Sequence, residues 1–369
     1  MNQMNRHWIF NRRLDLSLLL LPVWLCWLVF FLLPERWVNI DLPLWTWVVF
    51  ILGLDVSHVW STLFRTYLDP AEFSQHKKTL CLTPVLVLMV CFGIALFLRD
   101  WFWRALSYFA VFHFVKQQYG FMILYKAKAG DFTPKSLSDS SIIYLATLYP
   151  MVFWHLSPDR NFSWFIENDF FRLSDMVSDM QWILDICNLL YWLLILAWVR
   201  QEFLICRKNR SNASIGKILW VLTTAANWYL GIVFFNSDLV FSISNVVAHG
   251  VPYLVLINWY VIRKKRILAT GEKPYTFRWR WIGWIFGGSL FLAFIEEYGW
   301  DVLINREKQA FFTIFLPYTL SLTAIPTIQA AVLSVLILPQ VTHYVIDGGI
   351  WKNNEKNPHL NQILSIDRS

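Results

Sequence analysis

The chain has 369 residues, of which 57% are hydrophobic and 18% aromatic, while only 15% are charged. In soluble domains about a quarter of all residues are charged, so this composition excludes an ordinary soluble domain and predicts a polytopic membrane protein. The net charge of +7 comes from Lys and Arg residues that lie mostly in connections between apolar segments. Membrane topology explains that distribution, and no nucleic-acid partner is expected.

Ten apolar windows are long enough to span a membrane, which predicts an all-α bundle of about ten transmembrane helices. In chain order they cover residues 14–34, 41–64, 80–98, 101–125, 139–157, 181–204, 216–235, 239–262, 279–298 and 321–347. Residues 1–351 are interpreted as one transmembrane bundle and residues 352–369 as a short cytoplasmic tail.

The connections alternate in charge along the chain. Those on the side of the amino terminus carry most of the 32 Lys and Arg residues, and the positive-inside rule places that side in the cytoplasm. Both termini are therefore expected to be cytoplasmic, in what we interpret as a bacterial inner membrane. Asp69-Pro70 is expected to begin a short cytoplasmic helix. The amphipathic connection from Pro158 to Gln181 is expected to lie along the outer interface.

One apolar window contains four polar residues on a single helix face. Asp55, His58, Thr62 and Arg65 follow a spacing of three, four and three residues, so their side chains share one stripe. Ionisable groups within a membrane are costly unless they are paired, hydrated or bound to a metal. This face is therefore expected to line an interior site.

Three further windows carry a histidine with a polar neighbour at helical spacing. The pairs are His113 with Gln117, His249 with Asn245 and His343 with Asp347. The alternation of charge indicates that all four histidine-bearing segments cross the membrane in the same direction. Their histidines are therefore expected to meet in the cytoplasmic half of the membrane. A single buried histidine is more often a hydrogen-bonding residue than a ligand, but four at similar depth favour a metal site.

Imidazole and carboxylate groups are the usual ligands of iron, manganese and zinc. The five cysteines are scattered, which argues against a thiolate site or a disulfide framework. Gln117, Asn245 and Arg65 are expected to orient ligands or substrate as catalytic residues. Iron, mononuclear or dinuclear and not in haem, is the expected metal, with zinc as the second choice. The expected ligands are Asp55, His58, His113, His249, His343 and Asp347.

A metal at this depth can be reached by lipid tails and by dissolved dioxygen. We therefore expect an oxygenase, hydroxylase or desaturase that acts on a lipid or other apolar substrate, surrounded by membrane lipids and served by a cytoplasmic electron donor. The chain lacks the repeated histidine boxes of membrane fatty-acid desaturases. Three alternatives remain open: a proton- or ion-coupled transporter, a haem-binding electron carrier, and a metal-dependent lipid hydrolase or transferase.

Overall fold

A computed structural model describes most of the chain, and every regular element in the described part is a helix. The described residues are 6–40, 42–131, 134–157, 160–173, 181–208, 214–268, 274–315, 325–352, 357, 360–364 and 366. The part of the chain so described contains no strand. This is the outcome expected for apolar segments that must satisfy their backbone hydrogen bonds internally.

Each of the ten windows overlaps at least one helix, but among the described residues fewer than ten helices are both long and apolar enough to cross a membrane. In that part of the chain six helices meet both conditions: Arg12–Leu32, Leu44–Arg65, Pro70–Phe97, Gln181–Lys208, Ile215–Phe234 and Asp238–Ile267. The pair Pro326–Leu336 and Leu338–Ile350, bent by 44°, would add a seventh. The chain is thus a multi-pass membrane protein by these helices, while ten crossings and cytoplasmic termini stay predictions.

The three remaining windows form helices whose hydropathy or length is lower. They are α7 (Arg99–Ala129), α8 (Asp139–Leu156) and α12 (Pro274–Trp300). In α7 the reason is clear from the sequence, because His113, Lys116 and Gln117 interrupt its apolar residues.

Contacts along the chain group the residues into two compact units. Unit 1 comprises residues 1–42, 107–252 and 364–369, and unit 2 comprises residues 43–106 and 253–363. Three described helices, α7, α11 (Asp238–Leu268) and the short α16 (Leu360–Leu364), contribute residues to both units.

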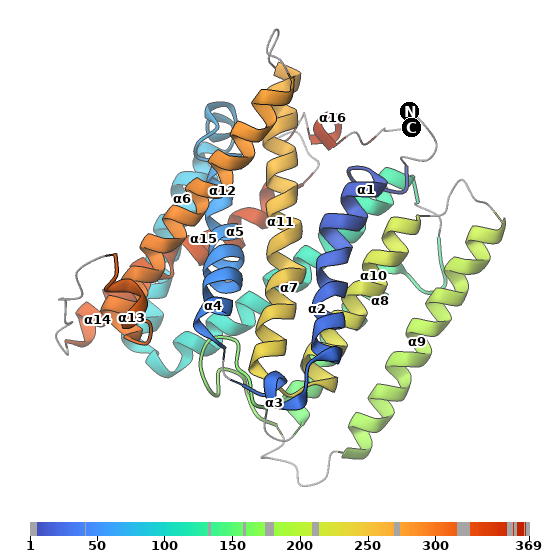
Figure 1. Ribbon diagram of the computed structural model, residues 1–369, viewed down its shortest axis with the longest axis horizontal. Coiled ribbons are helices and arrows are strands. Elements are labelled where there is room, and N and C mark those ends of the chain that lie inside the picture. Colours follow the sequence, from blue (N-terminus) through green and yellow to red (C-terminus); the bar gives the residue numbers. More distant parts are fainter. Residues whose placement is uncertain are drawn as a thin grey trace. The chain divides into compact units, whose positions relative to one another are not determined.

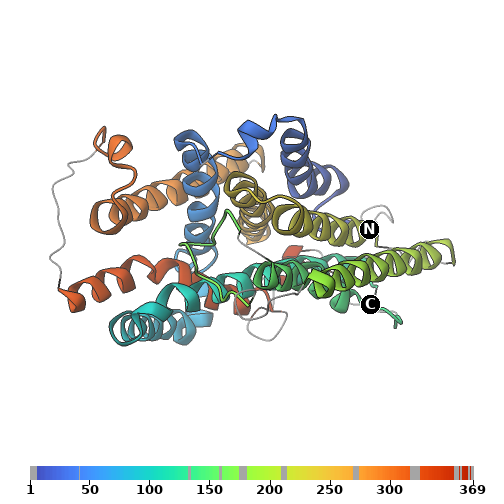
Figure 2. The ribbon, with the colours of Figure 1, turned by 90° about the horizontal axis from the view of Figure 1, so that it is seen from below.

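Unit 1 contains a layer in which α10 packs against both α2 and α8, and α9 packs on α8 (Figures 1 and 2). Two short elements precede α2, and a third follows it. The bounds are α1 Arg12–Leu14, η2 Asp15–Leu20, α2 Leu21–Leu32, α3 Glu35–Val38, α9 Gln181–Lys208, α10 Ile215–Trp228 and η6 Tyr229–Phe234. The element η2 consists of wider π-helical turns, as does η6.

The connection between α8 and α9 does not lie entirely at a surface. Phe162 and Phe170 are 8% and 5% exposed and belong to the hydrophobic core of unit 1, together with Trp154 and Phe241. The aromatic residues of this connection are therefore not all at the surface, because some of them are buried in the core of unit 1.

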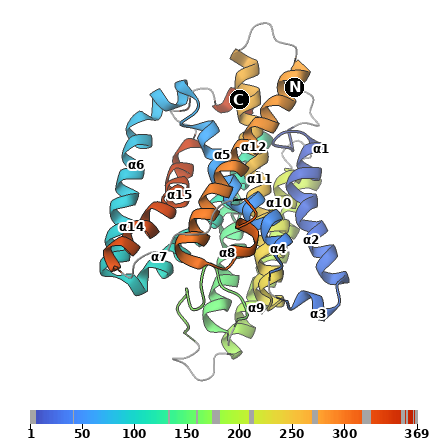
Figure 3. The ribbon, with the colours of Figure 1, turned by 60° about the vertical axis from the view of Figure 1, so that its left-hand side comes forward.

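Unit 2 is built around α12 and α6. The helix α12 packs along α5, and α6 packs along α14 and α15, which run beside it in Figure 3. The bounds are α4 Leu44–Thr46, η3 Trp47–Val56, α5 Ser57–Arg65, α6 Pro70–Phe97, η7 Asp301–Asn305, α13 Gln309–Phe312, α14 Pro326–Leu336, α15 Leu338–Ile350 and α16 Leu360–Leu364.

The expected helix start at Asp69-Pro70 is confirmed, but the helix is not short. The Asp69 side chain accepts hydrogen bonds from the backbone N–H groups of Ala71 and Glu72, at 3.1 and 3.2 Å. From there α6 continues to Phe97, with a local departure from helical geometry at His76. A capping aspartate followed by proline sets where a helix begins, whereas its end depends on the residues beyond.

Candidate metal centre

Four buried histidines are candidate metal ligands: His58, His113, His249 and His343. Their exposed fractions are 1%, 4%, 0% and 2% in that order. They fall into two pairs, one within each unit, and the two pairs are built alike.

The pair in unit 2 joins α5 to α15. His58 and His343 face each other with ring centroids 5.0 Å apart and ring planes at 80°. The ring nitrogens of the two residues lie within 4.8 Å of each other. Two imidazoles in this nearly perpendicular arrangement can both direct a lone pair toward one ion, as metal-binding histidines do.

A hydrogen-bonded chain orients His343. The Nδ1 atom of His343 lies 2.7 Å from Thr62 Oγ1, which lies 2.9 Å from the hydroxyl of Tyr253. With Nδ1 engaged in this way, Nε2 is the ring nitrogen through which His343 would bind a metal. A bond at the second ring nitrogen is the usual means by which a protein fixes the tautomer and direction of a ligand histidine.

Both predicted aspartate ligands lie outside the histidine group. Asp55 approaches His58, but its Oδ1 atom is 3.7 Å from Nδ1 and its side chain is 27% exposed. Asp347 accepts a hydrogen bond from the indole of Trp351 at 2.7 Å and also interacts with Tyr253. Asp55 thus lies beside His58, where a carboxylate can orient a ligand, whereas Asp347 is engaged by Trp351 and Tyr253.

The pair in unit 1 joins α7 to α11 and repeats this geometry. His113 and His249 have ring centroids 5.0 Å apart and planes at 75°. Here the orienting contact is aromatic, because Phe114 stacks on His249 with centroids 3.6 Å apart and planes at 7°. Phe114 in turn meets the edge of Trp164, from the connection between α8 and α9.

Gln117 lies one turn after His113, as its spacing predicts. Its Nε2 donates to the backbone carbonyl of His249 at 2.8 Å, while its Oε1 is buried with no hydrogen-bond partner among the described residues. A buried acceptor without a donor is costly, so a donor such as bound water would be stabilised there. Asn245 is 7% exposed on α11, one turn before His249.

Arg65 points to a different set of partners. Its guanidinium lies 2.6 Å from Glu72, donates to the carbonyl of Ile350 at 2.9 Å and stacks over Tyr260 at 3.7 Å. Glu72 also binds Lys264 at 2.7 Å. Arg65 thus belongs to a buried ionic network of unit 2. The structure does not bring it to the histidine pair, and its predicted catalytic role stays untested.

Sequence reasoning missed two residues that shape the pairs. Tyr253 lies with its ring edge toward both His58 and His343, at centroid distances of 5.7 and 5.1 Å, and Phe114 holds His249. The first had a sequence signal, since Tyr253 is four residues after His249 on one predicted helix. The second had none, because aromatic residues are frequent throughout this chain.

No protein-family model, curated protein or solved structure matches this chain. The residues themselves therefore carry the functional argument. Imidazole is a common ligand of divalent metals, so these histidines could hold a metal ion.

Proposed function

We propose that the protein is a membrane-embedded metal-dependent oxygenase, hydroxylase or desaturase acting on a lipid or other apolar substrate. The observation that carries the proposal is the pair of buried, perpendicular imidazoles in each unit, 5.0 Å apart in both cases. Such a repeated arrangement of a costly buried group is expected of ligands and is not needed for packing.

The proposal further joins the two pairs at one metal site. The helix α11 is continuous from Asp238 to Leu268, and its residues His249 and Tyr253 are four apart, so they share one face. Tyr253 contacts His58 and His343 directly. A single helical turn therefore separates one histidine pair from a residue that touches the other, which favours a shared site of four histidines.

In this site iron, with zinc as the second choice, would supply activation of dioxygen, which dissolves well in hydrocarbon. The chain would supply the rest of the chemistry. The four histidines hold the metal, Thr62 and Tyr253 fix the direction of His343, and Gln117 Oε1 accepts a hydrogen bond from a group bound beside His249. Burial of all four imidazoles excludes bulk water from the reacting atoms.

The proposed enzyme takes its substrate from the membrane and its electrons from the cytoplasm. An apolar substrate reaches the bundle from the membrane, which we take to be a bacterial inner membrane. Electrons come from a cytoplasmic donor, for which the basic run from Arg263 to Arg266, apart from the buried Lys264, offers complementary charge.

Metal analysis of the purified protein tests this proposal. The whole chain in detergent is examined by elemental analysis and absorption spectroscopy, beside four variants in which one histidine is replaced by alanine: His58→Ala, His113→Ala, His249→Ala and His343→Ala. His155→Ala is the matched control, since His155 contacts Tyr108 and lies outside the group. We expect iron without a haem band in the wild type and control, and its loss in all four variants.

The other outcomes separate the alternatives. If variants of one unit retain half of the metal, each pair binds an ion of its own and the shared site is wrong. Zinc in place of iron indicates the hydrolase or transferase, and a haem band indicates an electron carrier. Protein with no metal overturns the proposal in favour of ion-coupled transport, for which Asp55, Glu296 and Glu297, within electrostatic reach of one another, are the groups to test.

A further inference from the structure

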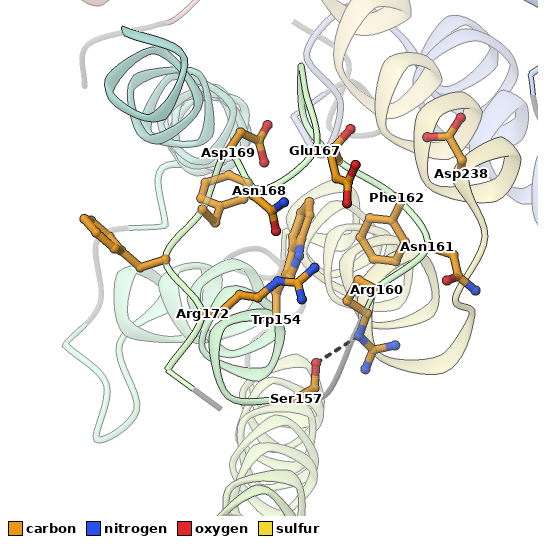
Figure 4. A pocket seen from close by; sticks show the side chains of 13 residues that line it. Trp154, Ser157, Arg160, Asn161, Phe162, Glu167, Asn168, Asp169, Arg172 and Asp238 are labelled. Carbon is orange, nitrogen blue, oxygen red and sulfur yellow. Dashed lines mark hydrogen bonds between the residues drawn. The ribbon is translucent and has the colours of Figure 1, made fainter. Parts of the chain in front are cut away.

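Unit 1 contains a cavity of about 440 Å³ at the connection between α8 and α9 (Figure 4). Its size falls in the range of small-molecule sites, roughly 300–1,000 Å³. Aromatic side chains of Trp154, Phe162 and Phe170 form part of the lining, and two arginines, Arg160 and Arg172, contribute the positive charge. The cavity therefore combines an apolar wall with cationic groups.

The segment around the cavity is held in shape by one buried carboxylate. Asp169 is 3% exposed, and its Oδ2 accepts hydrogen bonds from Ser107 Oγ at 2.9 Å and from the backbone N–H groups of Trp164 and Phe165 at 2.9 and 2.7 Å. The preceding residue, Asn168, has a φ of 62°, a conformation that asparagine tolerates well. The cavity is thus formed before any ligand arrives.

Arg160 is only partly compensated by its surroundings. Its Nε donates to Ser157 Oγ at 2.9 Å, and its guanidinium lies over the ring of Phe153 at 4.5 Å. No carboxylate forms an ion pair with Arg160 in the part of the chain that the structure describes. Burial lowers the pKa of Arg160 to about 10. An anion beside this guanidinium would offset that cost.

Three carboxylates also line the cavity, and two of them are already engaged. Asp169 holds the loop, as described above, and Asp238 begins α11 and accepts from Ser242 at 3.4 Å. Figure 4 shows both carboxylates directed away from Arg160. Glu167 is exposed at the rim, so its charge is the one that would oppose an anionic ligand.

The aromatic wall leads to the histidine pair of unit 1. Phe170 meets Trp164 edge-on at 6.3 Å, Trp164 meets Phe114 at 5.0 Å, and Phe114 stacks on His249 at 3.6 Å, all between ring centroids. These rings contact one another, so the aromatic lining of the cavity is packed continuously onto His249.

We propose that the cavity binds the anionic headgroup, a carboxylate or a phosphate, of a single-chain amphiphile. Arg160 and Arg172 bind the head, and the aromatic wall packs on the first carbons of the chain. This inference rests on the proposed function and names its substrate class. A guanidinium is the side chain best suited to such oxyanions, because it can donate two parallel hydrogen bonds.

Calorimetric titration of the full chain in nanodiscs of neutral lipid tests the proposal. The probes are octyl phosphate, octanoate, octanol and inorganic phosphate. We expect the two anionic amphiphiles to bind, and Arg160→Gln and Arg172→Gln each to weaken their binding about tenfold or more. Glu167→Gln removes the opposing charge and should tighten it severalfold. Arg36→Gln, which changes an exposed arginine of unit 1 outside the cavity, is the matched control and should leave binding unchanged.

Two results would overturn the proposal. If octanol binds as tightly as octanoate and the arginine variants change nothing, the cavity does not recognise an anion. If inorganic phosphate binds as tightly as octyl phosphate, the site recognises the free ion and the alkyl chain of the probe contributes nothing to binding.

Failure of the metal proposal can be told apart from failure of this one. The same titrations are repeated with His249→Ala, whose substitution removes a proposed ligand and leaves the arginines in place. Retained binding in a variant without metal supports the amphiphile site by itself. Loss of binding in a folded His249→Ala protein would contradict a headgroup site that is separate from the histidines.

Discussion

Thr62 is the residue on which the direction of His343 depends. It contacts the imidazole at 2.7 Å and Tyr253 at 2.9 Å, so it links a ring nitrogen to a buried phenol. A ligand histidine binds metal through one nitrogen, and the other nitrogen is almost always held by such a partner, which fixes the direction of the ring. The Thr62 hydroxyl is therefore expected to contribute to metal affinity through the orientation of His343.

Replacing Thr62 by valine tests this role. Thr62→Val keeps the shape of the side chain and removes its hydroxyl, so we expect metal affinity to fall by roughly 10- to 100-fold while the fold is retained. The measurement is competition with a chelator of known affinity. Thr66→Val is the matched control, because Thr66 donates to a backbone carbonyl at 2.7 Å without contacting an imidazole. Equal metal affinity in both variants would contradict the role of Thr62.

At the scale of elements, unit 1 is fastened by a buried ionic cluster where four helices end. Lys217 of α10 is fully buried and binds Asp131, Asp139 and Glu202 at 2.6, 3.1 and 2.8 Å. Lys135 binds the same three carboxylates, and Lys126 of α7 binds Asp139. The three positive and three negative charges balance, which is the condition for burying them together.

Removing Lys217 should be costly for this reason. In Lys217→Met, three carboxylates remain with two lysines, and breaking a buried pair typically destabilises a fold by about 3–5 kcal/mol. We expect a clear drop in the thermal unfolding midpoint of the protein in detergent. Lys208→Met changes an exposed lysine on α9 and should leave the midpoint nearly unchanged. A similar midpoint in both variants would mean that the cluster contributes nothing to stability.

Asp169 gives the connection between α8 and α9 a pH-dependent stability. Burial raises its pKa above the usual value of 3.8, although hydrogen bonds from Phe165, Ser107 and Trp164 lower it in part. The folded protein therefore keeps this proton to a higher pH than the unfolded chain does. The corresponding stabilisation is fully present below the unfolded pKa and is lost as the pH rises through the folded pKa.

A comparison with Asp169→Asn across pH checks the sign. We expect the thermal midpoint of the wild type to fall relative to that of the variant as the pH rises above about 4, and then to level off. Asp100→Asn, at an exposed position on α7, is the control for general effects of pH. A difference between wild type and Asp169→Asn that grows in the opposite direction would show that the hydrogen bonds outweigh burial.

At the scale of the whole molecule, the number of crossings and the side of the termini are the open predictions. Within the described ranges six helices, or seven with the bent pair, are long and apolar enough to span. Ten crossings further require α7, α8 and α12, whose polar residues would have to face other helices and not lipid. An even number places both termini on the same side.

Fusion reporters decide this point. With both termini cytoplasmic, green fluorescent protein at either end should fluoresce, and alkaline phosphatase at either end should be inactive in a bacterial host. Fusions in the connection between α8 and α9 should show the opposite pattern and serve as the internal control. Opposite results at the two termini would require an odd number of crossings.

The sequence by itself determined the helical membrane class, the positions of the long helices and the histidines that form the candidate centre. These follow from the length of apolar runs and from the high cost of a polar group within them. The helix that begins at Pro70 was also predictable, because Asp69 and Pro70 are a local signal.

Only the tertiary structure decided which polar groups meet. Spacing along a helix shows that Asp55 and His58 share a face, but the packing of neighbouring helices decides what that face contacts. For this reason Arg65 pairs with Glu72, Asp55 lies beside His58 and Asp347 accepts a hydrogen bond from Trp351. Tyr253 and Thr62 become part of the centre by the same packing, since contacts between distant segments depend on how each helix is rotated, which periodicity within one segment does not specify.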